Sequence, residues 1–76
     1  HMKEIVEIIA KALVDHPEQV VVEEKGDGQE AVFQLHVASD DMGKVIGRQG
    51  RIAKAMRTVV KAAAVRENKK VTVEIV

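Results

Sequence analysis

Cysteine, tryptophan and tyrosine are absent from the sequence, and Phe33 is its only aromatic residue. Without cysteine, neither a disulfide nor a thiolate metal site can form. With a single aromatic residue, a site that stacks nucleobases on aromatic side chains is excluded. Long hydrophobic runs are also missing, since no stretch approaches the roughly 20 apolar residues needed to cross a bilayer. The first predicted helix carries charges along its whole length, so it does not resemble a signal peptide.

The length of 76 residues indicates one domain. At this size folding buries roughly 60% of the surface of the unfolded chain, so we expect a modest core of helices packed on one small sheet. His1-Met2 resembles a cloning remnant followed by the start methionine, and residues 3 to 76 are expected to form the domain. The absence of a long apolar run, of a signal-peptide pattern and of cysteine together predicts a soluble cytoplasmic protein without a membrane partner.

Charge is balanced overall but not along the chain. The 12 basic and 12 acidic residues give a formal net charge of zero. Residues 42 to 61 nevertheless carry six basic residues and no acidic one, which leaves the rest of the chain at −6. The six basic residues are Lys44, Arg48, Arg51, Lys54, Arg57 and Lys61. This segregation favours a polyanionic partner over an ordinary solvated helix face, because such faces usually mix both signs.

The first half of the sequence predicts a helix followed by a β-hairpin. Residues 3 to 14 place apolar side chains at helical spacing, and Pro17 ends the helix because it forces the preceding residue out of helical geometry. The apolar stripe of this helix is Ile5, Ile8, Ile9, Ala12 and Leu13. A β-branched run at 20 to 25 and an alternating run at 31 to 37 flank the turn sequence Gly26-Asp27-Gly28. The predicted core side of the second run is Ala31, Phe33, Leu35 and Val37.

A short helix is predicted next. Ser39 or Asp40 can cap it, and Asp41 suits its first turn, where a negative charge meets the positive end of the helix dipole. Capping also explains why two carboxylates stand next to each other here. Glycine commonly follows the last turn of a helix, so we expect this helix to end at Gly47. Its apolar residues are Met42, Val45 and Ile46.

A longer helix and a closing strand complete the chain. The helix begins near Gly50 and runs to about Glu67, with three basic residues on the side opposite its apolar stripe. The stripe is Ile52, Ala55, Met56, Val59, Val60 and Ala63, and the basic row is Lys54, Arg57 and Lys61. Alternation of Val71, Val73 and Ile75 with polar residues predicts the strand. The expected order is therefore α-β-β-α-α-β, an α+β fold.

Gly47 and Gly50 bracket two polar residues where the two predicted helices meet. A helix that begins at Gly50 points backbone N–H groups and the positive end of its dipole outward, and a phosphate can bind there. Glycine also lets a sugar-phosphate chain approach the backbone closely. Taken alone, the spacing fits a tight turn with a capping glycine just as well.

The run from Gly43 to Ile52, Gly-Lys-Val-Ile-Gly-Arg-Gln-Gly-Arg-Ile, resembles the core motif of the KH domain, in which an Ile-Gly-x-x-Gly loop joins two helices. The expected element order matches the type II (prokaryotic) arrangement, a three-stranded mixed sheet packed against three helices. Residues 2 to 76 are most similar to the bacterial KhpA family of small stand-alone type II KH proteins, above all from Met42 to Ala64.

The resemblance implies which residues bind RNA. Gly47-Arg48-Gln49-Gly50 matches the loop that clamps the backbone of about four nucleotides in this family. Three basic residues lie within one turn of the loop and are expected to contact phosphates, namely Lys44, Arg51 and Lys54. Arg57 and Lys61 are further along the helix, where simple solvation explains them.

For the apolar and small residues next to the loop, core packing and RNA contact are the two alternatives. Ile46 is expected mainly in the core, whereas a groove wall and core burial fit Val45 and Ile52 equally. Glycine inside a helix costs about 0.5–1 kcal/mol relative to alanine, so Gly43 needs a reason. Close helix packing is the simpler reason, and close approach of RNA is the alternative.

The resemblance further implies a non-catalytic single-stranded-RNA-binding protein. Proteins of this family act as RNA chaperones or post-transcriptional regulators together with KhpB, a second KH-containing protein, in processes that include cell shape and peptidoglycan homeostasis. We expect micromolar and sequence-tolerant binding by this domain alone, with tighter binding through the avidity of two RNA-binding units. Homodimerisation or heterodimerisation through the same face is the main alternative function, because a small core gains stability from a partner.

Catalysis, metals and nucleotides find no support in the sequence. The lone serine, Ser39, has no histidine and carboxylate at a recognisable spacing. His16 and His36 are 20 residues apart without other soft ligands, and His36 is expected on the outer face of its strand. The glycines do not form a Walker loop, and the loop follows a helix, whereas a Rossmann turn follows a strand. We therefore expect no cofactor, no metal and no small-molecule substrate.

Overall fold

The computed structural model of the chain describes residues 2–27 and 29–76, and of Arg48 the backbone only. Gly28, the last residue of the predicted turn, lies outside the described residues. The elements are α1 (Met2–Leu13), the short 3-10 helix η1 (Pro17–Gln19), β1 (Val21–Gly26), β2 (Glu30–His36), α2 (Ser39–Arg66) and β3 (Lys70–Ile75). Within these residues no helix is long and apolar enough to cross a membrane.

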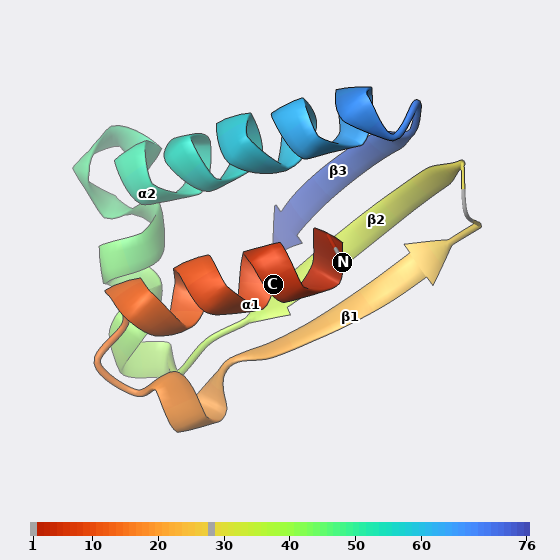
Figure 1. Cartoon of the computed structure of the whole chain (residues 1–76). Helices are drawn as coiled ribbons and strands as arrows, with labels where there is room; N and C mark the ends of the chain where they lie inside the picture. The colour runs from red at the N-terminus through yellow and green to blue at the C-terminus, as the bar shows by residue number, and fades with distance from the viewer. Residues whose placement is uncertain (1, 28) are drawn as a thin grey trace.

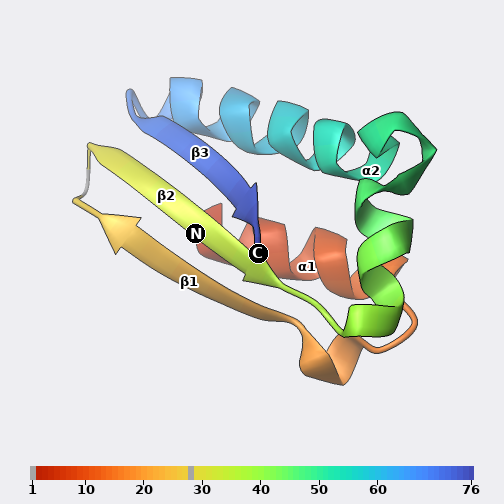
Figure 2. The same cartoon turned by 180° about the vertical axis from the view of Figure 1, so that it is seen from behind.

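The sheet has the order β1-β2-β3. Strands β1 and β2 pair antiparallel, with Val22 opposite Leu35, and β2 and β3 pair parallel, with Phe33 opposite Val73. Both helices cover one face of this sheet, as the front and back views show (Figure 1, Figure 2). The covered face carries the buried strand residues, Val22, Ala31, Phe33, Leu35 and Val73. The predicted alternation of the strands and the mixed three-stranded sheet are confirmed.

The hairpin turn needs glycine at one position. Gly26 has a φ of +95°, and a Cβ atom there would collide with the carbonyl oxygen of Glu30. Asp27 then closes the turn, because its Oδ1 accepts hydrogen bonds from the backbone N–H groups of Gln29 and Glu30, both at 2.8 Å. These bonds, that from Glu30 first, hold the pKa of the Asp27 carboxyl below its ordinary value.

Helix α1 packs on the sheet with a different face from the one predicted. The fully buried residues are Met2, Val6 and Ala10, flanked by the half-buried Ile5 and Ile9. The prediction was right for these two isoleucines and wrong for the rest of the stripe, since Ile8, Ala12 and Leu13 are exposed. Apolar residues fill two overlapping helical stripes in this sequence, and only contact with the sheet selects one of them.

Helix α2 is one continuous element in hydrogen-bonding terms, but it has two arms, residues 39–48 (the first arm) and 51–66 (the second arm). Figure 1 shows the first arm, in green, at one end of the molecule and the second arm, in teal to blue, running across the top. The second arm buries Ala53, Met56, Val60 and Ala64. Met56 and Val60 were predicted correctly, whereas Ala55 and Val59 are exposed and the prediction for them is wrong. With the two arms counted as helices, the predicted order α-β-β-α-α-β is confirmed.

The end of α2 is a Schellman-type cap. Asn68 takes a φ of +56°, its N–H donates to the carbonyl of Val65, and the N–H of Lys69 donates to the carbonyl of Ala64 at 2.9 Å. Asparagine tolerates positive φ better than most residues, so it can replace the usual glycine. The cap ends α2 within one residue of the predicted position and turns the chain directly into β3.

Candidate nucleic-acid interface

The two arms of α2 meet at the predicted loop. Gln49 has a φ of +62° and Gly50 a φ of +68°, so two consecutive residues leave right-handed helical geometry. The predicted end of the first helix at Gly47 is wrong by about half a turn, because Gly47 keeps a negative φ and the bend comes at Gln49 and Gly50. Right-handed geometry resumes after Gly50, and the second arm begins there with its first turn at the bend.

The glycines of this region face open space. Apart from its chain neighbours and the adjacent turns of its own helix, a Cβ atom on Gly43, Gly47 or Gly50 would meet no atom within 4 Å. The simpler explanation for Gly43, close packing within the chain, is therefore wrong. Only Gly50 has a conformational reason to be glycine, because its φ is positive. At Gly43 and Gly47 the exposed backbone is accessible to a ligand, and the fold itself does not require glycine there.

The basic side chains around the bend differ in how available they are for a phosphate contact. Arg51 and Lys54 are exposed on the second arm, as a phosphate contact requires. Lys44 is not free, since its Nζ lies 2.9 Å from the Asp15 carboxylate. Gln49 is exposed, and the side chain of Arg48 lies outside the described part of the chain.

Apolar residues next to the bend separate into core and surface. Val45 is fully buried, and Ile52 is half-buried and packs against the core. For these two residues, which the sequence left open, the structure therefore favours the core. Ile46 was predicted mainly in the core, and this is wrong, because 51% of it is exposed. The first arm turns Val45 into the core, and the next residue around the helix then faces solvent.

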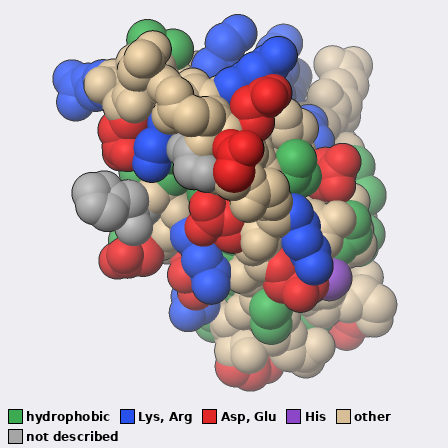
Figure 3. Space-filling model, turned by 90° about the vertical axis from the view of Figure 1, so that its right-hand side faces the viewer, with side chains coloured by type: hydrophobic (Ala, Val, Ile, Leu, Met, Phe, Trp, Pro, Cys, Tyr) green, Lys and Arg blue, Asp and Glu red, His purple; other side chains and the backbone are tan. Residues whose placement is uncertain are grey.

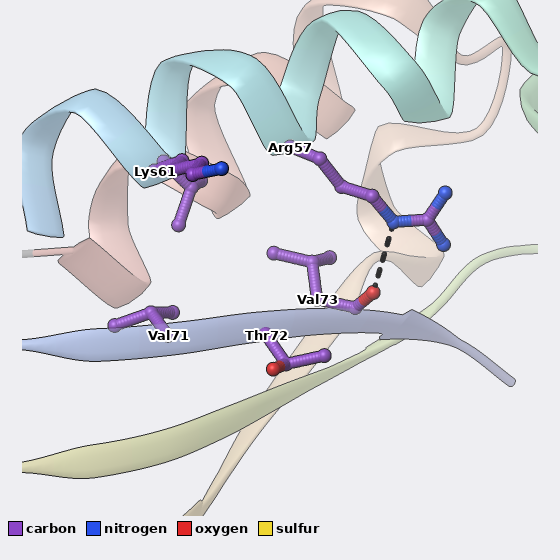
Figure 4. Close-up of a pocket in the computed structure, with 6 residues that line it drawn as sticks. Arg57, Lys61, Val71, Thr72 and Val73 are labelled. Carbon is purple, nitrogen blue, oxygen red and sulfur yellow. Dashed lines mark hydrogen bonds between the residues drawn. The ribbon is translucent and has the colours of Figure 1, made fainter.

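A groove runs between the second arm and β3. Arg57 does not simply extend into solvent, because its Nε donates a hydrogen bond of 3.1 Å to the carbonyl of Val73 on the strand (Figure 4). Arg57 and Lys61 form one side of a hollow of about 160 Å³, and Val71, Thr72 and Val73 form the other.

The groove continues past Lys61 into a second hollow of about 280 Å³. Lys69 and Lys70, which follow the helix cap, line this hollow with Lys61 and with apolar residues. Figure 3 views the end of the molecule that carries the α2–β3 turn, and Lys and Arg side chains lie along its upper edge, with both signs of charge below. Lys69 also pairs with Glu67 at 3.4 Å. Lys69 and Lys70 were not predicted from the sequence, because they lie outside the acid-free stretch and only the cap brings them to the groove.

Comparison with known proteins identifies the family. The family model of the KhpA/KhpB KH domain matches residues 3–75. The chain belongs to this family. It is 65% identical over 75 residues to the RNA-binding protein KhpA of Clostridium perfringens, covering 99% of this chain and 100% of the relative. The corresponding protein of Clostridium acetobutylicum is 61% identical with the same coverage, and that of Listeria monocytogenes is 47% identical over 99% of both chains. No solved structure was found to match significantly.

Asp41 and His36 of this KH domain make structural contacts. The predicted cap at Ser39 or Asp40 is wrong, since the N-cap residue is Ala38 and no side chain caps the helix. Asp41 does lie in the first turn, but its carboxylate accepts hydrogen bonds from the backbone of another segment, at Asp15 and His16. His36 lies on the open face of the sheet, where its Nε2 is 2.8 Å from the Glu23 carboxylate. Across residues 2–27 and 29–76 no group of three or more metal-ligating side chains comes together.

Proposed function

We propose that the chain is a non-catalytic protein that binds single-stranded RNA along α2, with Gly47-Arg48-Gln49-Gly50 as a clamp on the RNA backbone. The observation that carries the proposal is the bend in α2, where backbone without side chains faces open space next to an arm with exposed basic residues. A phosphate placed at the bend meets the first turn of the second arm, where the helix dipole is positive. The relatives named RNA-binding protein KhpA support the same ligand.

In this proposal the bound RNA runs along the second arm of α2. Arg51 and Lys54 stand next to the clamp, and the groove between α2 and β3 lies beyond them. Arg57 and Lys61 line this groove together with valine side chains. Phosphates can therefore pair with the basic side chains, and bases can pack against the valines. No aromatic side chain is available in the described residues for stacking, because Phe33 is buried in the core. Binding by this domain is therefore weak and sequence-tolerant, at micromolar affinity.

The domain acts with a second RNA-binding unit, in our proposal a KhpB-like KH protein. Avidity raises the effective affinity without any new contact, since the second binding event becomes intramolecular. Such a pair would work as an RNA chaperone or post-transcriptional regulator in the cytoplasm, with cell shape and peptidoglycan homeostasis among the processes that its RNA targets control. The resemblance to the KhpA family is the support for the partner and for these processes.

An interaction module is the second candidate function. Ile46 and Val59 are large apolar residues of α2 that are about half exposed, on the arms that carry the proposed clamp. A second protein copy can cover such residues, and RNA would then compete for the same face. Sedimentation of the protein at several concentrations, with and without RNA, separates the two functions.

The clamp is tested with the double variant Arg48→Asp, Gln49→Asp. Aspartate tolerates the positive φ at position 49, so circular dichroism should show an intact fold. Affinity for a single-stranded RNA of about 12 nucleotides should fall at least about tenfold, because negative charge replaces the phosphate contacts. The control is Lys3→Asp, Gln19→Asp, which makes the same change in net charge at exposed positions outside α2. A folded clamp variant that binds RNA as tightly as this control would disprove the assignment.

A further inference from the structure

Asp41 is the one charged side chain in the buried class among the described residues, with 1% of its surface exposed. Its two carboxylate oxygens accept one hydrogen bond each, from the backbone N–H groups of Asp15 and His16, both at 3.0 Å. These N–H groups lie just after the end of α1, in the connection that leads to η1. The side chain of Asp41 therefore ties α2 to a segment about 25 residues earlier in the chain.

The contact is a strong one for physical reasons. A buried carboxylate is stable only where hydrogen bonds replace its water, and Asp41 has two of them. Burial raises the pKa of this carboxyl, but the bonds from Asp15 and His16 and the nearby His16 and Lys44 outweigh burial, so that the pKa lies below its ordinary value. The ionised form of Asp41 therefore belongs to the native structure.

Among the side chains that the structure describes, the first arm of α2 buries one narrow face. Ala38, Asp41 and Val45 recur at helical spacing and are buried, so they anchor the arm to the rest of the domain. On the other side Gly43 and Gly47 face open space. Asp41 and Val45 lie one turn apart, and the proposed clamp follows directly at the end of this arm. Without Asp41 the arm would be held at Ala38 and Val45 by apolar contacts alone, which lack direction and would let the arm rotate and move the clamp.

We propose that Asp41 is a positioning residue for RNA binding, which sets the orientation of the clamp by fixing the first arm of α2 to the segment after α1. This inference rests on the proposed function, because it concerns the geometry of the same clamp. Lys44 supports the arm from outside through its ion pair with Asp15 at 2.9 Å. The connection between α1 and η1 thus takes part in binding.

The test is Asp41→Asn, which keeps the shape of the side chain but loses the charge and one acceptor. Affinity for a single-stranded RNA of about 12 nucleotides should fall about 5- to 20-fold at a temperature where the variant is fully folded. Asp40→Asn makes the same change of charge one residue away, at an 85% exposed carboxylate that lies 3.8 Å from the His16 ring, a solvent-screened pair that contributes little. Val6→Ala, in the buried face of α1, is the control for lost stability. It is measured at a temperature at which its folded fraction equals that of Asp41→Asn. Both controls should bind RNA within about twofold of the wild type.

Amide hydrogen exchange without RNA gives a second readout. In Asp41→Asn the N–H groups of residues 49 to 51 should exchange faster, while those of β2 stay protected as in Val6→Ala. If Asp41→Asn does not fold, Asp41→Glu carries the test, because it keeps the charge and moves the arm by one methylene. Equal RNA affinities for Asp41→Asn and Val6→Ala at matched folded fraction, with unchanged exchange at the bend, would overturn the proposal. Faster exchange at the bend in Asp41→Asn, together with a wild-type protein that binds no RNA, would instead reject the proposed function alone.

Discussion

At the scale of single residues, the backbone is left-handed at two described residues other than glycine, Gln49 and Asn68, for different reasons. Asn68 turns the chain at the end of α2, where its own N–H and that of Lys69 each close a backbone hydrogen bond, and asparagine tolerates its φ of +56° well. Gln49 has a φ of +62° without comparable tolerance and with an exposed side chain. Conformations of this kind cost of order 1 kcal/mol or more and persist where the surrounding structure or a function maintains them. This cost at Gln49 is consistent with a bend retained for binding.

Asp41 makes the stability of the domain dependent on acid. Because its pKa is lowered in the folded state, its contribution is complete above its unfolded value of about 3.9 and is lost as the pH falls through the still lower folded pKa. The difference in unfolding free energy between wild type and Asp41→Asn should therefore be constant from about pH 5 to pH 8. Below about pH 4 it should shrink toward zero. Urea denaturation of both proteins across this range measures the difference.

Asp27 also has a lowered pKa, and its effect has the same sign. It is present in both proteins, so it cancels in that comparison. A difference between wild type and Asp41→Asn that stays unchanged down to about pH 3 would show that the ionised carboxylate does not stabilise the fold.

At the scale of elements, α2 is unusual because its first arm contains glycines that the fold does not need. Glycine in a helix interior costs about 0.5–1 kcal/mol relative to alanine, chiefly in backbone entropy. Neither Gly43 nor Gly47 has a positive φ, and apart from the adjacent turns of its own helix a Cβ atom at either position would meet no atom within 4 Å. Alanine would fit at both positions and would stabilise the helix, so the fold does not explain the glycines. Close approach of an RNA backbone does explain them, because it requires that no side chain is present.

Alanine substitutions of these glycines should separate stability from binding. Gly43→Ala and Gly47→Ala should each raise the midpoint of thermal unfolding, by about 2–8 °C for about 0.5–1 kcal/mol, and weaken RNA binding. Gly50→Ala should lower both, because alanine at a φ of +68° is strained by about 1 kcal/mol. Thermal unfolding and fluorescence titration with RNA measure the two effects. Unchanged RNA affinity in a more stable Gly47→Ala protein would argue against contact at that position.

At the scale of the whole molecule, charge is arranged so that one side attracts a polyanion while the net charge remains zero. Arg57 and Lys61 of the second arm and the two lysines after the cap border one groove. Glu23 pairs with His36 on the open face of the sheet, away from the groove, whereas Glu67 pairs with Lys69 beside it. A field of this kind speeds association with RNA and is weakened by salt.

Salt dependence measures how many phosphates the groove and clamp contact. With three or four phosphates neutralised, the slope of log K against log salt should be about −2 to −3 for a single strand. Lys61→Ala should reduce the magnitude of this slope by about 0.7, since one phosphate contact is lost. Lys11→Ala, at an exposed position of α1, should leave the slope unchanged. An unchanged slope in Lys61→Ala would place the RNA outside the groove.

Local signals in the sequence were sufficient for the element order, for the hairpin and, to within about half a turn, for the bend, because alternation, turn residues and paired glycines act over a few neighbours. Contacts between distant segments were not predictable. Apolar residues filled more than one helical stripe of α1, and only packing on the sheet excluded Ile8. Asp41 looked like a helix-end acid, yet it binds the backbone after α1, and Arg57 looked solvated, yet it bonds to Val73. Such contacts depend on where the folded chain places partners far apart in sequence, and only the tertiary structure decides that.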